Sequence, residues 1–289
     1  MKVFVTGGSG YIGRATIGAL RWRGHEVAAL VRGDQAAELV TGLGATPVMG
    51  TLHDLDVLRT AAAEADGAIH LAQDRGPETA TVDAEASGAI QDGIGSGPYV
   101  HTGGVWVYGN TNGTVDEDAP QSPPSVTEWR ADNEKRVLGR AADGGCPVLI
   151  MPGVVYGRGA GLIEQFFTGP ARERHAVRVI GDGSNHWSLV HVDDVAELYA
   201  LALDASPGSV YAGVTTSDCT LAQVAEAASR AAGCPGRIES ITLEQAREVM
   251  GPIADAFALD QQVSSARARS QLGWNPSERD VLSEIAEGL

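Results

Sequence analysis

Lysine is nearly absent from this sequence, cysteine and aromatic residues are few, and long apolar runs are missing. Lys2 and Lys135 are the only lysines, and 21 basic face 37 acidic side chains, which gives a net charge of −16. So acidic a chain lacks the positive surface that nucleic-acid phosphates or anionic lipids require. We therefore expect neither nucleic acid nor a membrane as a partner.

The few cysteines and the missing apolar runs also bear on location. Cys146, Cys219 and Cys234 are odd in number and lack the spacing of a metal site. No run reaches the roughly 20 apolar residues of a membrane helix, and the N-terminus begins with strand-like residues rather than a signal peptide. We predict a cytoplasmic protein with free thiols and without a metal site. The oligomeric state stays open.

Glycine is abundant, and three glycines near the N-terminus have a defined spacing. Val3-Phe4-Val5 predicts a buried strand, and glycines follow it at intervals of three residues. In such a loop the first glycine permits a tight turn, the second lets a pyrophosphate approach, and the third lets the next helix pack closely. The helix N-terminus would bind the phosphates. The residues predicted to contact a dinucleotide here are Gly7, Gly10, Tyr11, Ile12 and Gly13.

Strand-like and helical segments alternate through the first half of the chain. This alternation predicts right-handed βαβ crossovers and an α/β fold with a Rossmann-type doubly wound parallel sheet. The predicted strands are Glu26–Val31, Thr46–Met49, Gly67–Leu71, Pro98–Thr102 and Pro147–Met151, and the predicted helices are Ile12–Arg23, Gln35–Leu43, Leu55–Ala65, Thr81–Ile94 and Trp129–Asp143.

After Pro152 the regular alternation ends, which predicts a smaller, discontinuous C-terminal substrate domain. Its expected strands Arg178–Ile180 and Trp187–Val190 lie among the helices Ile163–Glu173, Leu221–Ala232, Leu243–Met250 and Val263–Leu272. The helix Val192–Asp204 and the strand Ser209–Ala212 are expected to return to the sheet. The predicted boundaries are 1–152 and 191–214 for the NADP-binding domain, and 153–190 and 215–289 for the substrate-binding domain.

The residue at the end of the second predicted strand indicates the type of cofactor. An NAD-binding protein usually has an acid there, which hydrogen-bonds the ribose 2′-hydroxyl. Here the position falls on Val31, and Arg32 follows. A guanidinium suits a 2′-phosphate, which it can bind with two hydrogen bonds. The sequence therefore favours NADP(H) over NAD(H).

Several blocks, taken together, resemble the extended and atypical short-chain dehydrogenase/reductase families. They are Thr6–Gly13, Ile69–Ala72, Val105–Gly109, Pro152–Gly157, His191–Val195 and Leu272–Pro276. The resemblance covers essentially the whole chain and implies the fold but not the reaction, because this fold hosts many reactions. It also implies further cofactor contacts at Thr51, Leu52, Leu71, Ala72, Gln73, Thr102, Arg130, Pro152, Val154 and Val155.

The His191-Val192-Asp193-Asp194 block invites a metal-site interpretation, but it begins a predicted helix. Carboxylates in that position satisfy free backbone N–H groups, and the resemblance also makes the block structural. We therefore favour capping over metal binding.

Members of these families reduce or oxidise carbon with a Ser or Thr, a Tyr, and a Lys four residues after the Tyr. The resemblance assigns these three positions to Gly104, Val126 and Arg130, and Tyr-x-x-x-Lys occurs nowhere in the chain. Glycine and valine cannot donate a proton, and arginine hardly deprotonates. Without these three groups, a bound cofactor could still transfer hydride, because it is held close to the substrate. Abstraction of a proton from a sugar hydroxyl would be harder. A proton would then come from solvent or from the substrate.

Other residues could donate a proton or contact a substrate. Weak proton-donor candidates are Tyr108, Tyr156 and His186, each with a structural alternative. Trp106 and Trp187 could form the wall of a pocket for a flat aromatic substrate, or pack in a core.

Three functions stay open from the sequence. We favour an NADPH-dependent ketoreductase for a bulky, aromatic or polyketide-like ketone, because the altered triad resembles natural-product ketoreductases of the angucyclinone type. The alternatives are a non-catalytic NADP(H)-binding or redox-sensing protein and a sugar-nucleotide epimerase or dehydratase.

Overall fold

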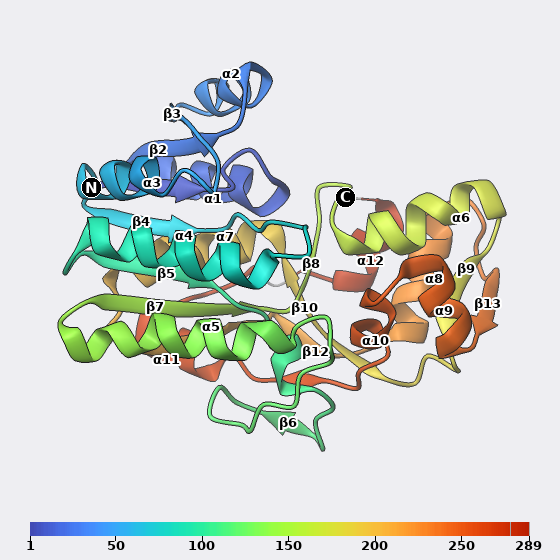
Figure 1. Ribbon diagram of the computed structural model, residues 1–289. Helices are drawn as coiled ribbons and strands as arrows, with labels where there is room; N and C mark the ends of the chain where they lie inside the picture. Colours follow the sequence, from blue (N-terminus) through green and yellow to red (C-terminus); the bar gives the residue numbers. More distant parts are fainter. Residues whose placement is uncertain (278, 289) are drawn as a thin grey trace.

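The computed structural model describes residues 1–277 and 279–288, and a seven-stranded parallel sheet lies at its centre (Figure 1). The strand order β11-β7-β5-β4-β1-β2-β3 confirms the predicted Rossmann-type, doubly wound α/β fold. The strands are β1 (Lys2–Thr6), β2 (Glu26–Val31), β3 (Thr46–Met49), β4 (Gly67–His70), β5 (Pro98–Thr102), β7 (Cys146–Pro152) and β11 (Ser209–Gly213).

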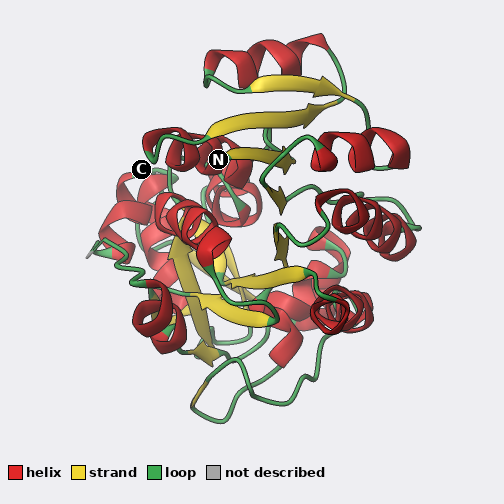
Figure 2. Cartoon of the chain, turned by 90° about the vertical axis from the view of Figure 1, so that its left-hand side faces the viewer, coloured by secondary structure: helices red, strands yellow, loops and turns green. Residues whose placement is uncertain are grey.

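Alternate residues of each strand enter cores on opposite faces of the sheet, as the period of two requires. In β1, Val3 and Val5 enter one core and Phe4 enters the other. Figure 2 shows helices on both sides of the strands. The face of the sheet that carries Val3 and Val5 is covered by α1 (Tyr11–Trp22), α2 (Asp34–Gly42) and α7 (Val192–Leu201), and the opposite face by α3 (Leu55–Ala63), α4 (Thr79–Ile94) and α5 (Glu128–Gly139).

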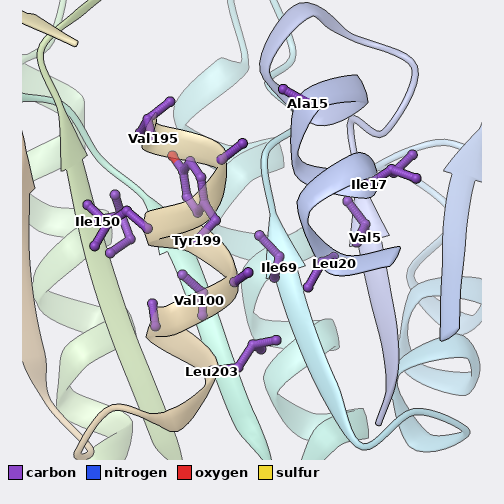
Figure 3. Packing of buried hydrophobic residues seen from close by; sticks show 14 of the residues in the cluster. Val5, Ala15, Ile17, Leu20, Ile69, Val100, Ile150, Val195, Tyr199 and Leu203 are labelled. Atoms are coloured by element: carbon purple, nitrogen blue, oxygen red, sulfur yellow. The ribbon is translucent and has the colours of Figure 1, made fainter. Parts of the chain in front are cut away.

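The helix α7 returns to the sheet, as the sequence predicted. Figure 3 shows its Val195 and Tyr199 beside Ile150 and Val100 of the strands, with Leu20 of α1 on the same face. All five side chains are buried. Because α7 comes after the change of pattern at Pro152, this packing ties the second half of the chain to the first.

A second core lies beyond the carboxyl ends of the central strands, on the right in Figure 1. One small sheet joins β8, β10 and β12, and another joins β9 and β13. These elements are β8 (Val154–Tyr156), β9 (Val177–Ile180), β10 (His186–His191), β12 (Thr216–Thr220), β13 (Ile238–Ile241), α6 (Gly169–Arg174), α8 (Leu221–Ala231), α9 (Leu243–Met250), α10 (Ile253–Phe257) and α12 (Val281–Glu287). None of the described helices is long and apolar enough to cross a membrane.

The predicted boundary of the second domain needs a correction near the C-terminus. The strand β14 (Gln262–Val263) pairs with β6 (Thr114–Val115), and α11 (Ala266–Leu272) lies against β11. Ala268 and Trp274 are buried in the core of the central sheet. The sequence predicted that this stretch belongs to the substrate domain and that its helix begins at Val263. In the structure, its apolar side chains instead cover the edge strand β11.

The predicted helix Ile163–Glu173 is also different in the structure. A π-helical turn occupies Glu164–Thr168, and α6 follows it. Pro170 has no N–H with which to bond the carbonyl of Phe166 four residues earlier, so the regular α-helical pattern cannot continue. The strand β12 was not predicted, because its residues Thr-Ser-Asp-Cys-Thr are mostly polar.

Candidate functional site

The turn from β1 to α1 is built from main chain in close contact. Gly7 has φ +73°, a value that favours glycine, and a Cβ there would lie 2.7 Å from the backbone nitrogen of Ala72. A Cβ on Gly13 would overlap the carbonyl oxygen of Gly7. Gly10 precedes α1 without a side-chain cap, and the first turn contains no acid. This leaves a helix N-terminus suited to a phosphate group.

Tyr11 connects this turn to the second part of the molecule. Its hydroxyl donates to the carbonyl oxygen of Gly157 over 2.8 Å. A Cβ on Gly161 would lie 2.9 Å from the Tyr11 ring, so the loop 157–161 lies against the ring. Burial raises the pKa of the Tyr11 hydroxyl, and Asp193 raises it further. Tyr11 therefore acts here as a neutral donor.

At the ends of β2 and β3 the structure places the residues expected to bind the adenosine half. Arg32 directly follows β2, is exposed, and has no carboxylate partner within residues 1–277 and 279–288. Thr51 follows β3 and donates to Asp54 through its backbone nitrogen, at 2.7 Å, and through its hydroxyl, at 2.8 Å. These bonds lower the pKa of Asp54. Leu52 is half-buried in the same turn.

The ends of β4 and β5 are joined by hydrogen bonds that converge on Thr102. Its hydroxyl donates to the carbonyl oxygen of His70 at 2.7 Å and accepts from Tyr199 at 3.0 Å. Arg130 donates to the carbonyl oxygen of Thr102 at 3.0 Å and to the side chain of Gln73 at 3.2 Å. The guanidinium also lies 4.5 Å from the centre of the Trp129 ring. Arg130 is thereby fixed at the strand ends.

Titratable side chains are buried directly behind these strand ends. Asp83 of α4 accepts from the Asn133 amide at 3.1 Å and lies 3.5 Å from His70 Nε2 and 3.7 Å from His101 Nε2. Burial alone would raise the pKa of Asp83, but His70, His101 and Asn133 outweigh it and hold the pKa far below its usual range. Burial lowers the pKa of His101 to about 3, so this ring is neutral.

The same cluster connects to the glycine-rich turn. His70 Nδ1 lies 2.6 Å from the hydroxyl of Thr6, and that hydroxyl accepts from the backbone nitrogen of Ala72 at 3.3 Å. Leu71 donates from its nitrogen to the carbonyl oxygen of Thr6 at 3.3 Å. The segment 71–73 is therefore held beside the loop that begins at Gly7.

An aromatic cluster lies in the core beyond the strand ends and includes a residue of the turn that follows β5. The rings of Trp106 and Phe166 each contact Phe257 edge to face, with centroids 5.8 Å and 5.4 Å away. Trp106 follows β5 in a 3₁₀ turn, whereas Phe166 belongs to the π-helical turn. Trp106 and Phe166 are half-buried and present part of their rings. This surface, which we call the aromatic wall, joins the two cores.

Comparison with known sequences identifies the family. Residues 3–212 match the NAD dependent epimerase/dehydratase family. The chain belongs to this family. An uncharacterised protein of Schizosaccharomyces pombe is 31% identical over 99% of this chain and 98% of its own length. A 4-hydroxy-2-methyl-3-oxo-4-farnesyl-3,4-dihydroquinoline-1-oxide ketoreductase of Stigmatella aurantiaca is 31% identical over 72% of this chain and 66% of its own length.

Solved structures of epimerases and dehydratases share the fold. A double mutant of dTDP-glucose 4,6-dehydratase from Streptomyces venezuelae, with NAD and DAU bound, has a TM-score of 0.83 at 19% identity and covers 100% of this chain and 95% of its own. UDP-glucose 4-epimerase from Thermus thermophilus, in complex with NAD, has a TM-score of 0.79 at 22% identity, with 100% and 97% covered. These similarities show that the chain shares the fold of these enzymes.

The three positions that the resemblance assigned to the catalytic triad lie close to the Thr102 hydrogen bonds. Gly104 follows β5 by two residues, and a Cβ on it would meet nothing within 4 Å, so this position opens onto free space. Val126 is half-buried ahead of α5. Arg130 is the member that forms hydrogen bonds at the strand ends.

The three weak proton-donor candidates each have another contact in the structure. The Tyr108 hydroxyl is buried and donates to the carbonyl oxygen of Glu117 at 3.3 Å. Tyr156 is buried with its ring edge to face against His191. His186 Nδ1 lies 2.8 Å from a carboxylate oxygen of Asp260. Burial raises the pKa of both tyrosines.

The prediction for Trp187 needs a correction. Its side chain is only 3% exposed, and its indole N–H donates to the carbonyl oxygen of Phe257 at 3.0 Å. Trp187 therefore supports the aromatic wall from behind, and the role of contacting a substrate stays a prediction for Trp106. The sequence alone does not separate the two tryptophans, because their burial depends on Phe257, a residue distant from both in the chain.

The remaining predicted residues lie at the junction of the two cores. Pro152 ends β7, and Val154 and Val155 begin β8, where both are buried. The nearby His191 block caps α7, since the ring nitrogen Nδ1 of His191 accepts from the backbone nitrogen of Asp193. Asp194 accepts from the nitrogen and the hydroxyl of Ser277, which anchors the C-terminal segment.

Sequence reasoning missed Glu134 as a functional candidate. It lies one helical turn after Arg130 and is 2% exposed, and neither carboxylate oxygen has a hydrogen-bond partner among the described residues. Burial raises its pKa to about 7, although the Arg130 guanidinium acts in the opposite direction. Its spacing of four from Arg130 can be read from the sequence, but its burial without a partner cannot.

Proposed function

We propose that this protein is an NADPH-dependent reductase that transfers hydride to the ketone of a bulky, aromatic compound. The observation that carries the proposal is the aromatic wall, in which the half-buried rings of Trp106 and Phe166 pack against the buried Phe257 and Trp106 lies in the turn that follows β5. A planar apolar substrate gains from such rings both burial and edge-to-face contact.

The cofactor preference is supported by Arg32. An unpaired, exposed guanidinium at the end of β2 suits a 2′-phosphate, and Val31 replaces the acid that would bind a 2′-hydroxyl. The residues present also fit a dinucleotide, because side chains on Gly7 and Gly13 would fill the space where main chain and phosphate approach.

Residues of this chain would bind and orient the cofactor while it supplies the hydride. Arg130 and Gln73, already held at the strand ends, are positioned to hydrogen-bond the ribose next to the nicotinamide. Thr102 keeps β5 in register with β4 through the carbonyl of His70. The aromatic wall excludes water from the ketone, which strengthens electrostatic contacts there.

The proton for the reduced oxygen comes from the substrate or from solvent in this proposal. Gly104 and Val126 carry no acidic group, and Arg130 does not release a proton. The hydroxyl of Tyr108 is buried and bonded to main chain. A phenol beside the substrate ketone would polarise the carbonyl through an internal hydrogen bond at a high effective concentration.

The names of relatives support a ketone substrate. Besides the quinoline-oxide ketoreductase, a 2-alkyl-3-oxoalkanoate reductase of Stenotrophomonas maltophilia is 28% identical over 74% of this chain. A sugar-nucleotide epimerase or dehydratase is the second candidate, favoured by the solved structures of similar fold. The missing Tyr-x-x-x-Lys argues against it, because epimerisation and dehydration begin with proton abstraction from a hydroxyl. A non-catalytic NADP(H)-binding protein is the third.

A substrate panel tests the proposal. Purified protein with NADPH is offered hydroxylated aromatic ketones, their O-methyl ethers, and UDP- and dTDP-glucose. We expect NADPH oxidation with the free hydroxy ketones, slower turnover with the ethers, and none with the sugar nucleotides. Trp106→Leu should raise KM about tenfold or more, as loss of a buried aromatic contact does, whereas Trp22→Leu, at an 84% exposed site, should change nothing.

The proton source is tested by variants in the same assay. Tyr108→Phe, Tyr156→Phe and His186→Gln should each lower kcat by less than about tenfold, far below a positioned acid's usual contribution. Loss of turnover in one of them, with NADPH affinity intact, would identify that residue as the acid. Conversion of a sugar nucleotide without net NADPH use would replace the proposal with the second candidate.

A further inference from the structure

Glu134 is a buried carboxyl group that the proposed hydride transfer does not use. Its residue is 2% exposed, and both carboxylate oxygens lack a hydrogen-bond partner within the described part of the chain. An unpartnered buried polar group is costly to keep, and such groups are rare in folded proteins. Its placement therefore calls for an explanation beyond packing.

The carboxyl group lies directly behind the backbone that ends β5. A Cβ on Gly103 would lie 2.7 Å from Glu134 Oε1, so the two groups are in close contact. Gly103 separates Thr102, whose carbonyl oxygen accepts from Arg130, from Gly104, which opens onto free space. Glu134 is therefore in contact with the residue next to this open position.

Opposing charges surround the carboxyl. Arg130 on the same helix favours the ionised form of Glu134, while Asp83 on α4 disfavours it. His101 on β5 is neutral, and His70 on β4 lies against Asp83. The Tyr108 hydroxyl, from the 3₁₀ turn, stays protonated, and β7 contributes the uncharged Met151. Burial is the largest influence and, with these charges, raises the pKa of Glu134 to about 7, so one additional charge nearby would change its protonation at neutral pH.

We propose that Glu134 is a positioning residue that binds and releases a proton in step with the charge of the nicotinamide ring bound at the end of β5. The inference rests on the cofactor part of the proposed function. An oxidised nicotinamide ring carries a positive charge that the reduced ring lacks, and a positive charge favours the carboxylate form. In a poorly hydrated interior this attraction acts over several ångströms.

The step balances with the proposed reaction. Hydride transfer breaks a C–H bond of the cofactor with its electron pair and forms a C–H bond at the carbonyl carbon, whose oxygen takes a proton from substrate or solvent. Glu134 meanwhile loses its proton to solvent, and it regains one when the oxidised cofactor leaves. One hydride and one proton are consumed per turnover, and Glu134 returns to its starting state.

The test compares binding of NADP⁺ and NADPH as a function of pH, without any turnover. Between pH 6 and 8 we expect the ratio of NADP⁺ affinity to NADPH affinity to rise about five- to tenfold, because one unit of pKa difference corresponds to tenfold. Titration of the 2′-phosphate affects both ligands equally and cancels in the ratio. In Glu134→Gln the ratio should change less than twofold, whereas Glu128→Gln, on the exposed first turn of α5, should behave as the unchanged protein.

Calorimetry in buffers of different ionisation enthalpy counts the protons directly. We expect NADP⁺ binding at pH 7 to release more protons than NADPH binding, and the difference to disappear in Glu134→Gln. Equal proton numbers in the unchanged protein and the variant, with normal cofactor affinity, would overturn the inference and leave the proposed function intact. Failure of both proteins to bind either cofactor would overturn both.

A measurement on the unchanged protein covers the case in which the variant does not fold. The infrared band of a buried protonated carboxyl group should be present in the NADPH complex and weaker in the NADP⁺ complex at pH 7. An identical band in the two complexes would contradict the proposal.

Discussion

The glycine-rich turn and the ends of β4 and β5 lie at the same edge of the sheet, yet they are built differently. The turn is made of main chain, in which Gly7 and Gly13 leave no room for side chains. The strand ends are held by side chains from distant segments, including the buried Asp83, His101 and Glu134. The conformation of the glycine-rich turn therefore depends on the absence of side chains. The arrangement of the strand ends depends on charge and hydrogen bonds.

This difference determines how each region responds to change. The conformation of the glycine-rich turn is insensitive to pH, but the turn has no room for an added side-chain atom. A buried cluster of titratable groups has room for a side chain of the same shape but responds to any change of charge. The following predictions, from the largest expected effect to the smallest, separate these two behaviours.

The largest effect on cofactor binding is expected for Gly13→Ala. The added Cβ would overlap the Gly7 carbonyl oxygen, and neither backbone can move without disturbing the turn. NADPH affinity should fall by about 100-fold or more, which corresponds to about 3 kcal/mol. Gly18→Ala on the same helix, where a Cβ meets nothing within 4 Å, should bind NADPH normally and gain about 0.5–1 kcal/mol of stability. Equal effects of the two substitutions, measured by calorimetry and denaturation, would refute the spatial account.

Asp83→Asn should destabilise the protein by about 3–5 kcal/mol at pH 7, as loss of a buried charge with its partners does. The pKa of Asp83 is lowered in the folded state, so its contribution is present above its unfolded pKa and is lost as the pH falls below about 4. The difference from the unchanged protein, measured by urea denaturation, should thus shrink toward low pH. Asp56→Asn, in an exposed pair with Arg59, should change stability by less than about 0.5 kcal/mol. A pH-independent loss in Asp83→Asn would show that packing rather than charge is responsible.

Arg32→Ala should weaken NADPH binding by about 1.5–3 kcal/mol, the usual value for a hydrogen bond to a charged group. NADH binding should change less than twofold, because it has no 2′-phosphate. Arg23→Ala, which removes a pair with Glu197 at the far end of α1, is the control and should affect neither cofactor. Equal affinities of the unchanged protein for NADPH and NADH would exclude this role.

Glu134→Gln should stabilise the protein at pH 8 by about 1–3 kcal/mol and leave it unchanged at pH 4. The folded-state pKa, raised from 4.5 to about 7, means that the folded protein holds a proton which the unfolded chain has lost. The stability of the unchanged protein should therefore fall as the pH rises from 4.5 to 7 and then level off. If the free energy of unfolding changed with pH in the same way in the protein and in Glu134→Gln, Glu134 would not titrate in this range.

The same contrast explains how much the sequence predicted. The glycine-rich turn and strands β1–β5 were predicted because their signals are local, such as three glycines at fixed spacing and apolar runs between helices. The aromatic wall and the Glu134 environment were not, because Phe166 meets Phe257 and Glu134 meets Gly103 only after segments far apart in the chain fold together. The sequence did not predict the polar strand β12 or the packing of segment 262–274 for the same reason. The structure of both is determined by the segments they pair with rather than by their own residues.

The central claim, hydride transfer to a ketone at the end of β5, is tested most directly with NADPH deuterated at the transferring carbon. The protein is incubated with this cofactor and a hydroxylated aromatic ketone, and the alcohol is analysed by mass spectrometry and NMR. We predict one deuterium at the former carbonyl carbon, in a single configuration, and none in a reaction with Gly13→Ala. Absence of deuterium from every product, with the labelled cofactor bound at normal affinity, would contradict the proposed function.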